Sequence, residues 1–332
     1  MDLLERDGDH EVLNRALADA ERGSGSVVLI GGEAGIGKTR LVQSFSEVNA
    51  DDARILWGAC DDLSTPRTLG PFRDIAGQVD GALKDAVIEG TRGEVFDAVF
   101  DVVTNTGRPT VVVIEDVHWA DGATLDVLKF LGRRIDRAPV TLVLTYRDEE
   151  VPDNHPLMLM FGDLPGSALH RVYPAPLSKP AVAELASGYA GSVEDLFSLT
   201  RGNPFLVTEA LLTPAGGVPA NVRDAVRTRA SRLSPTGRAV ADLISVVPGQ
   251  TELWLIEGFP EFDPRALDEC HQRGLVEYDS VHAWYRHELV RGAMEESLEP
   301  QRRRVLNAYV VEALSGHEAD IARIVHHLSL IH

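Results

Sequence analysis

Eight consecutive residues from Gly32 to Thr39 follow the pattern Gly-x-x-x-x-Gly-Lys-Thr. Such glycines let the backbone curl, so that successive N–H groups and the start of the next helix point at one anion. Lys38 can reach the β- and γ-phosphates of a nucleotide, and the hydroxyl of Thr39 can ligate Mg²⁺. The pattern therefore predicts a phosphate-binding loop (P-loop). Its remaining expected contacts come from Gly32, Ala34, Gly35, Ile36 and Gly37.

The same loop also begins a second glycine pattern. Gly35 and Gly37 are spaced as in the Gly-x-Gly-x-x-Gly signature of dinucleotide-binding folds, but Arg40 occupies the third glycine position. A dinucleotide site is therefore excluded. We expect Arg40 to lie in the first turn of the following helix, beside the bound nucleotide.

A P-loop needs a second, carboxylate centre, and Glu115-Asp116 follows the apolar run 111–114. The carboxyl ends of parallel strands are where α/β folds bind ligands. One acid would hold Mg²⁺, usually through water, and the other would polarise the attacking water. The sequence leaves open which of the two acids holds the metal.

Arg147 follows the apolar run 140–144. An arginine at the tip of a strand beside the carboxylate strand can sense the γ-phosphate. The alternative is a surface arginine paired with Asp148 or Glu149.

These groups must be positioned by a sheet. Short β-rich runs alternate with helical stretches, which is typical of a parallel sheet with helices on both faces. The fold class is therefore α/β, of the P-loop NTPase type. We expect a helix from about Lys38 to Val48. The expected strands are 26–30, 54–57, 110–114 and 140–144.

After about residue 165 the pattern becomes mainly helical, with Ser-x-Pro and Ser-Pro helix starts. Three expected helices (221–232, 235–246 and 264–273) precede a hairpin at 275–285, which is the outline of a winged helix. The loose stretch 213–219 predicts a hinge. The expected domains are a nucleotide-binding domain at 1–165, a helical lid at 166–216, a winged helix at 217–300 and the start of a helical region at 301–332.

The order of these motifs resembles the ATPase module of STAND-class AAA+ proteins, above all large LuxR-type transcriptional regulators related to the maltose regulator. Glu115 departs from the aspartate that many relatives have there. Regulators of this type continue through a helical sensor region to a C-terminal DNA-binding domain, so we expect either a fragment or a short stand-alone version. The resemblance rests on segments 4–7, 32–40, 115–121, 145–147, 201–205, 231–235 and 285–289.

The resemblance implies three further nucleotide contacts. Arg6 belongs to an N-terminal element that lies against the adenine, and Pro204 packs on the base from the lid. His287 approaches the β-phosphate of ADP. A lone histidine after a strand is otherwise usually structural or solvated.

Composition excludes several classes of protein. The net charge of −19 opposes binding to nucleic acid, because non-specific binding neutralises phosphates with Lys and Arg. The two cysteines have no CxxC or His-rich partner, which argues against a metal framework. No apolar run approaches the roughly 20 residues that span a bilayer, and the N-terminus lacks the order of a signal peptide. We therefore expect a cytoplasmic protein with no membrane contact.

Three functional hypotheses follow. The first is an ATP/ADP switch with slow hydrolysis, which self-associates in its ATP state and contacts DNA only through a further C-terminal domain. The second is a stand-alone AAA+ ATPase of the initiator or remodeller type whose winged helix binds DNA. Its candidate recognition helix, 263–273, carries three acids against two arginines, which opposes docking on phosphates. The third is a working ATPase of another kind, such as a remodeller or a small-molecule kinase. A kinase would need an acceptor motif, and none is present in the sequence.

Overall fold

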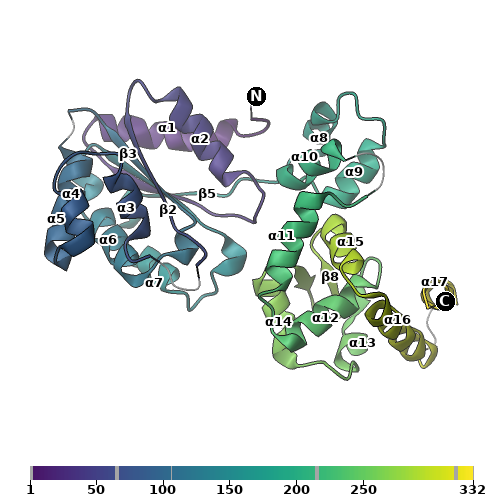
Figure 1. Ribbon diagram of the computed structural model, residues 1–332. Coiled ribbons are helices and arrows are strands. Elements are labelled where there is room, and N and C mark those ends of the chain that lie inside the picture. Colours follow the sequence, from purple (N-terminus) through teal and green to yellow (C-terminus); the bar gives the residue numbers. More distant parts are fainter. Residues whose placement is uncertain (1–2, 64–66, 106, 214–216, 318–320, 332) are drawn as a thin grey trace. The chain divides into compact units, whose positions relative to one another are not determined.

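The computed structural model describes residues 3–63, 67–105, 107–213, 217–317 and 321–331. The chain forms two compact units, Met1–Ala175 (unit 1) and Pro176–His332 (unit 2), each with its own buried core (Figure 1). Each unit is treated separately below. Among the described residues, none of the helices combines the length and the apolar character that spanning a bilayer requires.

Unit 1 is built on a five-stranded parallel sheet in the order β2-β3-β4-β1-β5. The four expected strands are confirmed within one or two residues at their ends. The sequence analysis missed the edge strand β5, because it is short and only its last residue is buried. The strands are β1 (Ser26–Ile30), β2 (Arg54–Ala59), β3 (Thr110–Glu115), β4 (Val140–Thr145) and β5 (Leu169–Val172).

The side chains of the central strands alternate between the two faces of this sheet. Val28 and Ile30 of β1 pack with α1 and α2 on one face, whereas Val27 and Leu29 belong to the core on the other. This period of two is the strand geometry expected for a sheet covered on both sides. Each fully buried aliphatic side chain contributes about 1.5–3 kcal/mol relative to exposure.

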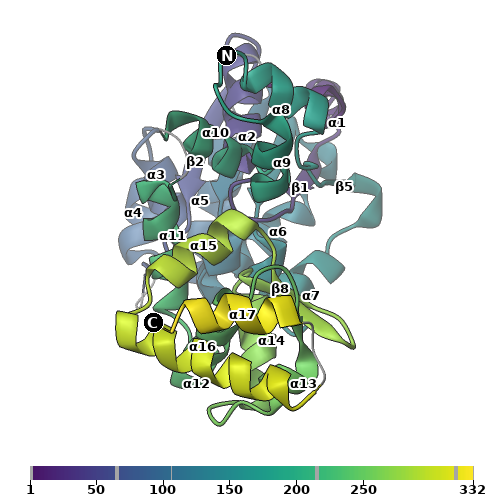
Figure 2. The ribbon, with the colours of Figure 1, turned by 90° about the vertical axis from the view of Figure 1, so that its right-hand side faces the viewer.

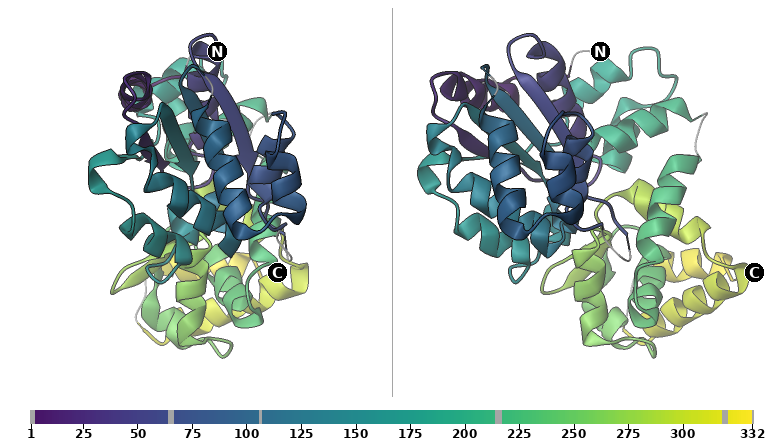
Figure 3. Two further views of the ribbon diagram at one scale, coloured as in Figure 1. Left: turned by 90° about the vertical axis from the view of Figure 1, so that its left-hand side faces the viewer. Right: turned by 60° about the vertical axis from the view of Figure 1, so that its left-hand side comes forward.

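Helices cover both faces of the sheet, as the fold class predicts. The blue helices α3 to α5 lie over one face in Figure 3, and α1 and α2 lie over the other in Figure 1. The expected helix 38–48 is confirmed as α2. The helices of unit 1 are α1 (Asp7–Glu21), α2 (Lys38–Val48), α3 (Gly70–Ala76), α4 (Leu83–Glu89), α5 (Arg92–Thr104), α6 (Gly122–Gly132) and α7 (Pro156–Gly162). Short 3-10 turns η1 (Val117–Trp119), η2 (Ile135–Arg137), η3 (Asp148–Glu150) and η4 (Gly166–Ala168) also occur.

Unit 2 is mostly helical and carries a small antiparallel sheet in the order β6-β8-β7. The three expected helices and the hairpin are present with slightly different ends. Helices α16 and α17, in yellow, lie side by side in Figure 2. The strands are β6 (Thr251–Glu252), β7 (Val276–Tyr278) and β8 (His282–Tyr285). The helices are α8 (Lys179–Leu185), α9 (Val193–Thr200), α10 (Pro204–Leu212), α11 (Ala220–Ala230), α12 (Pro235–Ser245), α13 (Leu253–Glu257), α14 (Pro264–Gln272), α15 (Glu288–Glu296), α16 (Pro300–Ser315) and α17 (Ile321–Ser329).

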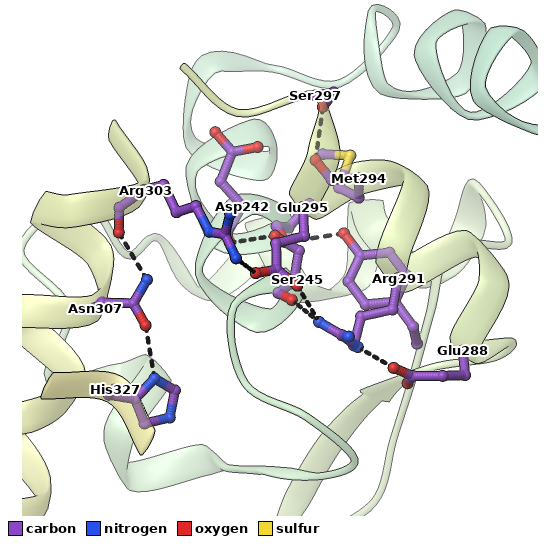
Figure 4. A network of polar contacts seen from close by, with 12 residues as sticks. Asp242, Ser245, Glu288, Arg291, Met294, Glu295, Ser297, Arg303, Asn307 and His327 are labelled. Carbon is purple, nitrogen blue, oxygen red and sulfur yellow. Dashed lines mark hydrogen bonds and ion pairs between the residues drawn. The ribbon is translucent and has the colours of Figure 1, made fainter. Parts of the chain in front are cut away.

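A polar network joins several of these helices within unit 2 (Figure 4). Arg291 of α15 donates to Glu288, Glu295 and the backbone oxygen of Ser245 in α12. The buried ring of His327 in α17 hydrogen-bonds through Nδ1 to Oδ1 of Asn307 in α16, at 2.7 Å. Buried polar groups paired in this way specify how their helices dock.

The end of unit 1 differs from the expected domain boundary at residue 165. Because β5 pairs with β1, the sheet-bearing unit runs ten residues further, to Ala175. The division of the rest into a lid, a winged helix and a helical start stays a prediction. Residues 214–216, the centre of the expected hinge, lie outside the described residues.

Candidate nucleotide-binding site

The P-loop connects the fully buried strand β1 to the N-terminus of α2. Gly32, Gly35 and Gly37 have φ angles of 143°, 83° and 100°, a region that glycine enters without steric cost. Gly37 is also the N-cap of α2, so its left-handed turn directs the chain into the helix. The backbone geometry is that of an anion cradle, as the sequence predicts.

Lys38 is buried, and its ammonium group points back across this loop. Its Nζ donates to the backbone oxygens of Gly32, at 2.5 Å, and Glu33, at 2.9 Å. Burial lowers the pKa of Lys38, and the negative charge of Glu149 opposes that shift. Thr39 and Arg40, which follow in the first turn of α2, are exposed.

A carboxylate that the sequence analysis did not assign to the site contacts the cradle. The backbone N–H of Ala34 donates to Oε1 of Glu149 at 2.9 Å. Oε2 of Glu149 is buried and has no hydrogen-bond partner among the described residues. A loop amide that the motif assigns to phosphate is therefore bonded to a protein carboxylate.

Glu115 is the last residue of β3, and one of its two carboxylate oxygens accepts a hydrogen bond from a neighbouring side chain. Its Oε2 accepts a hydrogen bond from Nε1 of Trp57, on the neighbouring strand β2, at 3.0 Å. Its Oε1 is buried and accepts no hydrogen bond from any residue that the structure describes. A buried acceptor without a donor is costly unless water or a cation approaches it, so Oε1 suits a metal-bound water.

Asp116, the next residue, has a left-handed backbone with φ 53° and ψ 44°. Its N–H donates to Oγ1 of Thr145, at the end of β4, at 3.0 Å. Burial raises the pKa of the Asp116 carboxyl, whereas the charges of Arg147 and Lys38 lower it. The two acids are thus distinguished, with Glu115 bonded to an indole and Asp116 facing the cations of the site.

Arg147 is held by the turn that follows β4. Its Nη1 donates to Oε1 of Glu150 at 2.7 Å, and its guanidinium lies over the ring of Trp119, 4.7 Å from the centroid. Nε1 of Trp119 also donates to Glu150, through Oε2, at 3.1 Å. The acid paired with Arg147 is therefore Glu150, and not Asp148 or Glu149 as the alternative reading had it.

His118 lies next to Asp116 and Glu150. Its side chain is fully buried, and neither ring nitrogen has a hydrogen-bond partner among the described residues. Burial, with the charges of Arg147 and Lys38, lowers the pKa of His118 to about 3. The ring is therefore neutral near pH 7, and its contacts of 3.9 Å with Asp116 and 3.8 Å with Glu150 are not ion pairs.

Arg6, expected beside the adenine, is buried at the start of α1. Its Nη2 donates to the backbone oxygens of Ile36, at 3.2 Å, and Ala175, at 2.8 Å. The side chain thereby ties the P-loop to the end of unit 1. Its expected contact with the base stays a prediction.

Pro204 and His287, the other two expected nucleotide contacts, belong to unit 2. Pro204 is the first residue of α10, where a proline costs no hydrogen bond, and Asn203 caps that helix. His287 is buried and is the N-cap residue of α15. Their approach to a nucleotide stays a prediction.

Strand order explains why the groups of unit 1 meet. Because β4 lies between β3 and β1, Arg147 emerges between the acids after β3 and the P-loop after β1. Among the residues that the structure describes, no cluster of three or more His, Cys, Asp or Glu side chains could bind a metal. Mg²⁺ commonly relies on one or two carboxylates together with substrate phosphates, so Thr39, Glu115 and Asp116 fit such a site.

Comparison with protein families assigns the first part of the chain. Residues 2–144 match the family model described as the AAA ATPase domain. The match covers the P-loop and both acids but ends before Arg147 and does not include unit 2.

Solved structures agree on the fold. The Walker-type ATPase of Pyrococcus abyssi superimposes with a TM-score of 0.57 at 14% identity, over 88% of this chain and 96% of that one. The STAND protein with a tetratricopeptide repeat sensor from Pyrococcus horikoshii gives 0.38 at 18% identity, over 96% and 47%. The Aeropyrum pernix ORC1 protein, solved in complex with DNA, gives 0.49 at 16% identity, over 89% and 93%. Only the first of the three has a TM-score above 0.5, so only that likeness carries an argument, and at 14% identity it concerns the fold alone.

Among curated proteins, an uncharacterized protein of Rhizobium meliloti (strain 1021) is 24% identical over 383 residues. The alignment covers 94% of this chain and 37% of that protein. The chain thus spans little more than a third of the length of its relative.

Proposed function

We propose that the chain binds ATP and ADP with Mg²⁺ and hydrolyses ATP slowly. The observation that carries this proposal is the buried ammonium of Lys38 inside a loop with three left-handed glycines, at the same sheet edge as Glu115, Asp116 and Arg147. Among the described residues, the hydrogen bonds of the Lys38 ammonium go to two uncharged carbonyls, which compensate a buried positive charge poorly. A polyphosphate would supply the missing negative charge.

In this proposal, the site residues of unit 1 have different roles in hydrolysis. Lys38 and the loop amides bind the phosphates, while Thr39 and one of the two acids hold Mg²⁺, which screens the phosphate charge when bound. One oxygen of Glu115 accepts no hydrogen bond from the residues that the structure describes and can orient water, and the charge of Asp116 is stabilised by those of Arg147 and Lys38. Arg147 stabilises charge on the terminal phosphate after leaving Glu150.

We further propose that the identity of the bound nucleotide, ADP or ATP, controls the conformation of the chain, and that hydrolysis does not drive a continuous cycle of work. Pro204 would pack on the base and His287 would approach the β-phosphate of ADP, so that unit 2 closes over the diphosphate. ATP would relax this closure and expose a surface for self-association. A switch of this kind requires contacts that differ between the two nucleotides. The buried position of His287 at a helix start and the rigid start of α10 support such roles.

We also propose that the chain is the regulatory ATPase module of a LuxR-type transcriptional regulator, and that residues 217–300 form a winged helix. The order α12-β6-α13-α14-β7-β8 supports the winged helix. Direct DNA binding by α14 is not favoured, because Asp268 and Glu269 are hydrogen-bonded only to the uncharged groups of Tyr278 and Ser234 among the described residues, and their negative charge repels phosphates. DNA contact would then require a further domain.

The test is to release and identify the nucleotide from purified protein, for the wild type and for Lys38→Ala. We expect adenine nucleotide, mainly ADP, from the wild type and none from the variant. Turnover far below the median of about 10 s⁻¹ for enzymes would support a switch. Lys84→Ala is the matched control, because it removes the same type of side chain from an exposed position in α4, outside the P-loop, and keeps the buried lysine.

A wild type that carries no adenine nucleotide and binds none on titration overturns the nucleotide proposal. Steady turnover at many per second, with no change in association state between ADP and ATP, overturns the switch and leaves an ATPase of another kind.

A further inference from the structure

The carboxylate of Glu149 accepts a hydrogen bond from a P-loop amide that the motif predicts for phosphate. Its Oε1 accepts the N–H of Ala34 at 2.9 Å, and its Oε2 is buried with no hydrogen-bond partner among the described residues. A carboxylate in this position imitates a phosphate oxygen, because both are anions that accept from loop amides. Glu149 is the second residue of η3, the turn after β4.

The hydrogen bond between Ala34 and Glu149 lies in the part of the P-loop that is farther along the chain from α2. The ammonium of Lys38, which in such loops reaches the β- and γ-phosphates, bonds to the carbonyls of Gly32 and Glu33. Ala34 directly follows Gly32 and Glu33 in the loop. The inner phosphates instead face the start of α2, three residues or more further on. A γ-phosphate that replaced these carbonyls beside Lys38 would then lie next to the N–H of Ala34.

We propose that Glu149 is a built-in competitor for the γ-phosphate, so that ATP must displace it whereas ADP need not. The proposal rests on the nucleotide binding proposed above. Glu149 and a γ-phosphate cannot both accept the single N–H of Ala34, and two anions at that distance repel each other. Displacement thus lowers affinity for the triphosphate alone, and the site favours ADP.

The same turn connects this competition to Arg147. Glu150, the neighbour of Glu149, accepts from both Arg147, at 2.7 Å, and Nε1 of Trp119, at 3.1 Å. Movement of η3 away from the P-loop would shift Glu150 relative to Trp119 in η1 and so weaken the contacts that hold Arg147. Arg147 is then released toward the terminal phosphate only after a triphosphate has entered.

The test is calorimetric titration of the full chain, freed of nucleotide, with Mg²⁺-ADP and with a non-hydrolysable Mg²⁺-ATP analogue. Glu149→Ala should raise affinity for the analogue about tenfold or more, the scale of one charge-assisted hydrogen bond, and change affinity for ADP less than about twofold. Glu149→Gln removes the charge and keeps an acceptor, so a smaller gain is expected. Asp148→Ala is the matched control, since it removes an exposed acid from the same turn and should alter neither affinity.

Trp119 provides a second readout of the release of Arg147. In the wild type, the ATP analogue should change the emission of Trp119 and ADP should not, and Trp119→Phe should abolish the change. In Glu149→Ala the change in Trp119 emission should appear at a lower concentration of the ATP analogue than in the wild type.

Equal gains for both nucleotides in Glu149→Ala, or no gain for either, overturn the competition while leaving the proposed function intact. Failure of every protein, the wild type included, to bind either nucleotide overturns both. The same Trp119 response to ADP and to the analogue overturns the connection to Arg147.

Discussion

The hydroxyl of Thr145 accepts a hydrogen bond from the backbone N–H of Asp116 at 3.0 Å, joining the ends of β4 and β3. Asp116 stands in a left-handed conformation that costs a non-glycine residue roughly 1–2 kcal/mol. The bond to Thr145 offsets part of that cost. It also fixes the backbone from which the Asp116 side chain projects, and the charges of Arg147 and Lys38 lower the pKa of that carboxyl, against the raising effect of burial.

Replacing Thr145 with valine should therefore impair both stability and hydrolysis. Valine keeps the shape and leaves the N–H of Asp116 without its acceptor, which costs about 1–3 kcal/mol of unfolding free energy. Urea unfolding measures the loss, and single-turnover hydrolysis should slow while nucleotide affinity changes little. Thr145→Ser keeps the hydroxyl and should retain most of both properties. Equal behaviour of the two variants would contradict this role.

Glu115→Gln should separate binding from hydrolysis. The amide preserves the volume and the acceptor for Trp57, but it removes the charge that orients water or metal. We expect hydrolysis to fall about 100-fold or more, the lower range for loss of a general base, with nucleotide affinity within a few-fold. Single-turnover kinetics and calorimetry measure the two quantities. Unchanged hydrolysis would exclude Glu115 from the reaction.

Gly202→Ala tests the backbone before α10. Gly202 has φ 76°, and a Cβ there would lie 2.1 Å from the backbone oxygen of Leu177. The matched control is Gly188→Ala, where φ is 91° but nothing lies within 4 Å of the added atom. The control should lose about 1–2 kcal/mol from conformational strain alone, and Gly202→Ala should lose clearly more. Chemical unfolding compares them, and equal losses would show that the clash is relieved without cost.

His118 predicts a dependence of stability on pH. Its pKa is lowered from 6.5 to about 3 in the folded protein, so between these values the unfolded chain binds one more proton. Its contribution to stability is full above pH 6.5 and is lost as the pH falls, by about 1.4 kcal/mol per unit at most. Unfolding free energies at pH 7, 5.5 and 4.5 should decline more steeply for the wild type than for His118→Leu. Parallel curves would mean that the ring takes up its proton without unfolding.

Local features of the chain were sufficient to predict much of unit 1. The run of apolar residues before Gly32 and the glycine spacing predicted β1, the loop and α2, because strands and P-loops are set by neighbours in sequence. The same holds for the acids after β3. The edge strand β5 could not be predicted, since Leu169–Val172 is stabilised by pairing with β1 rather than by its own apolar pattern.

Only the tertiary structure decided how the charged groups pair. By sequence Arg147 could pair with Asp148 or Glu149, yet it pairs with Glu150, while Glu149 reaches Ala34, 115 residues earlier in the chain. Likewise, Arg6 is bonded to backbone oxygens at Ile36 and Ala175, which no spacing in the sequence reveals. The identity of the loop followed from the residues themselves, because its chemistry is local. Which acid enters the loop depends on strand order and on the path of a turn, which exist only in the folded chain.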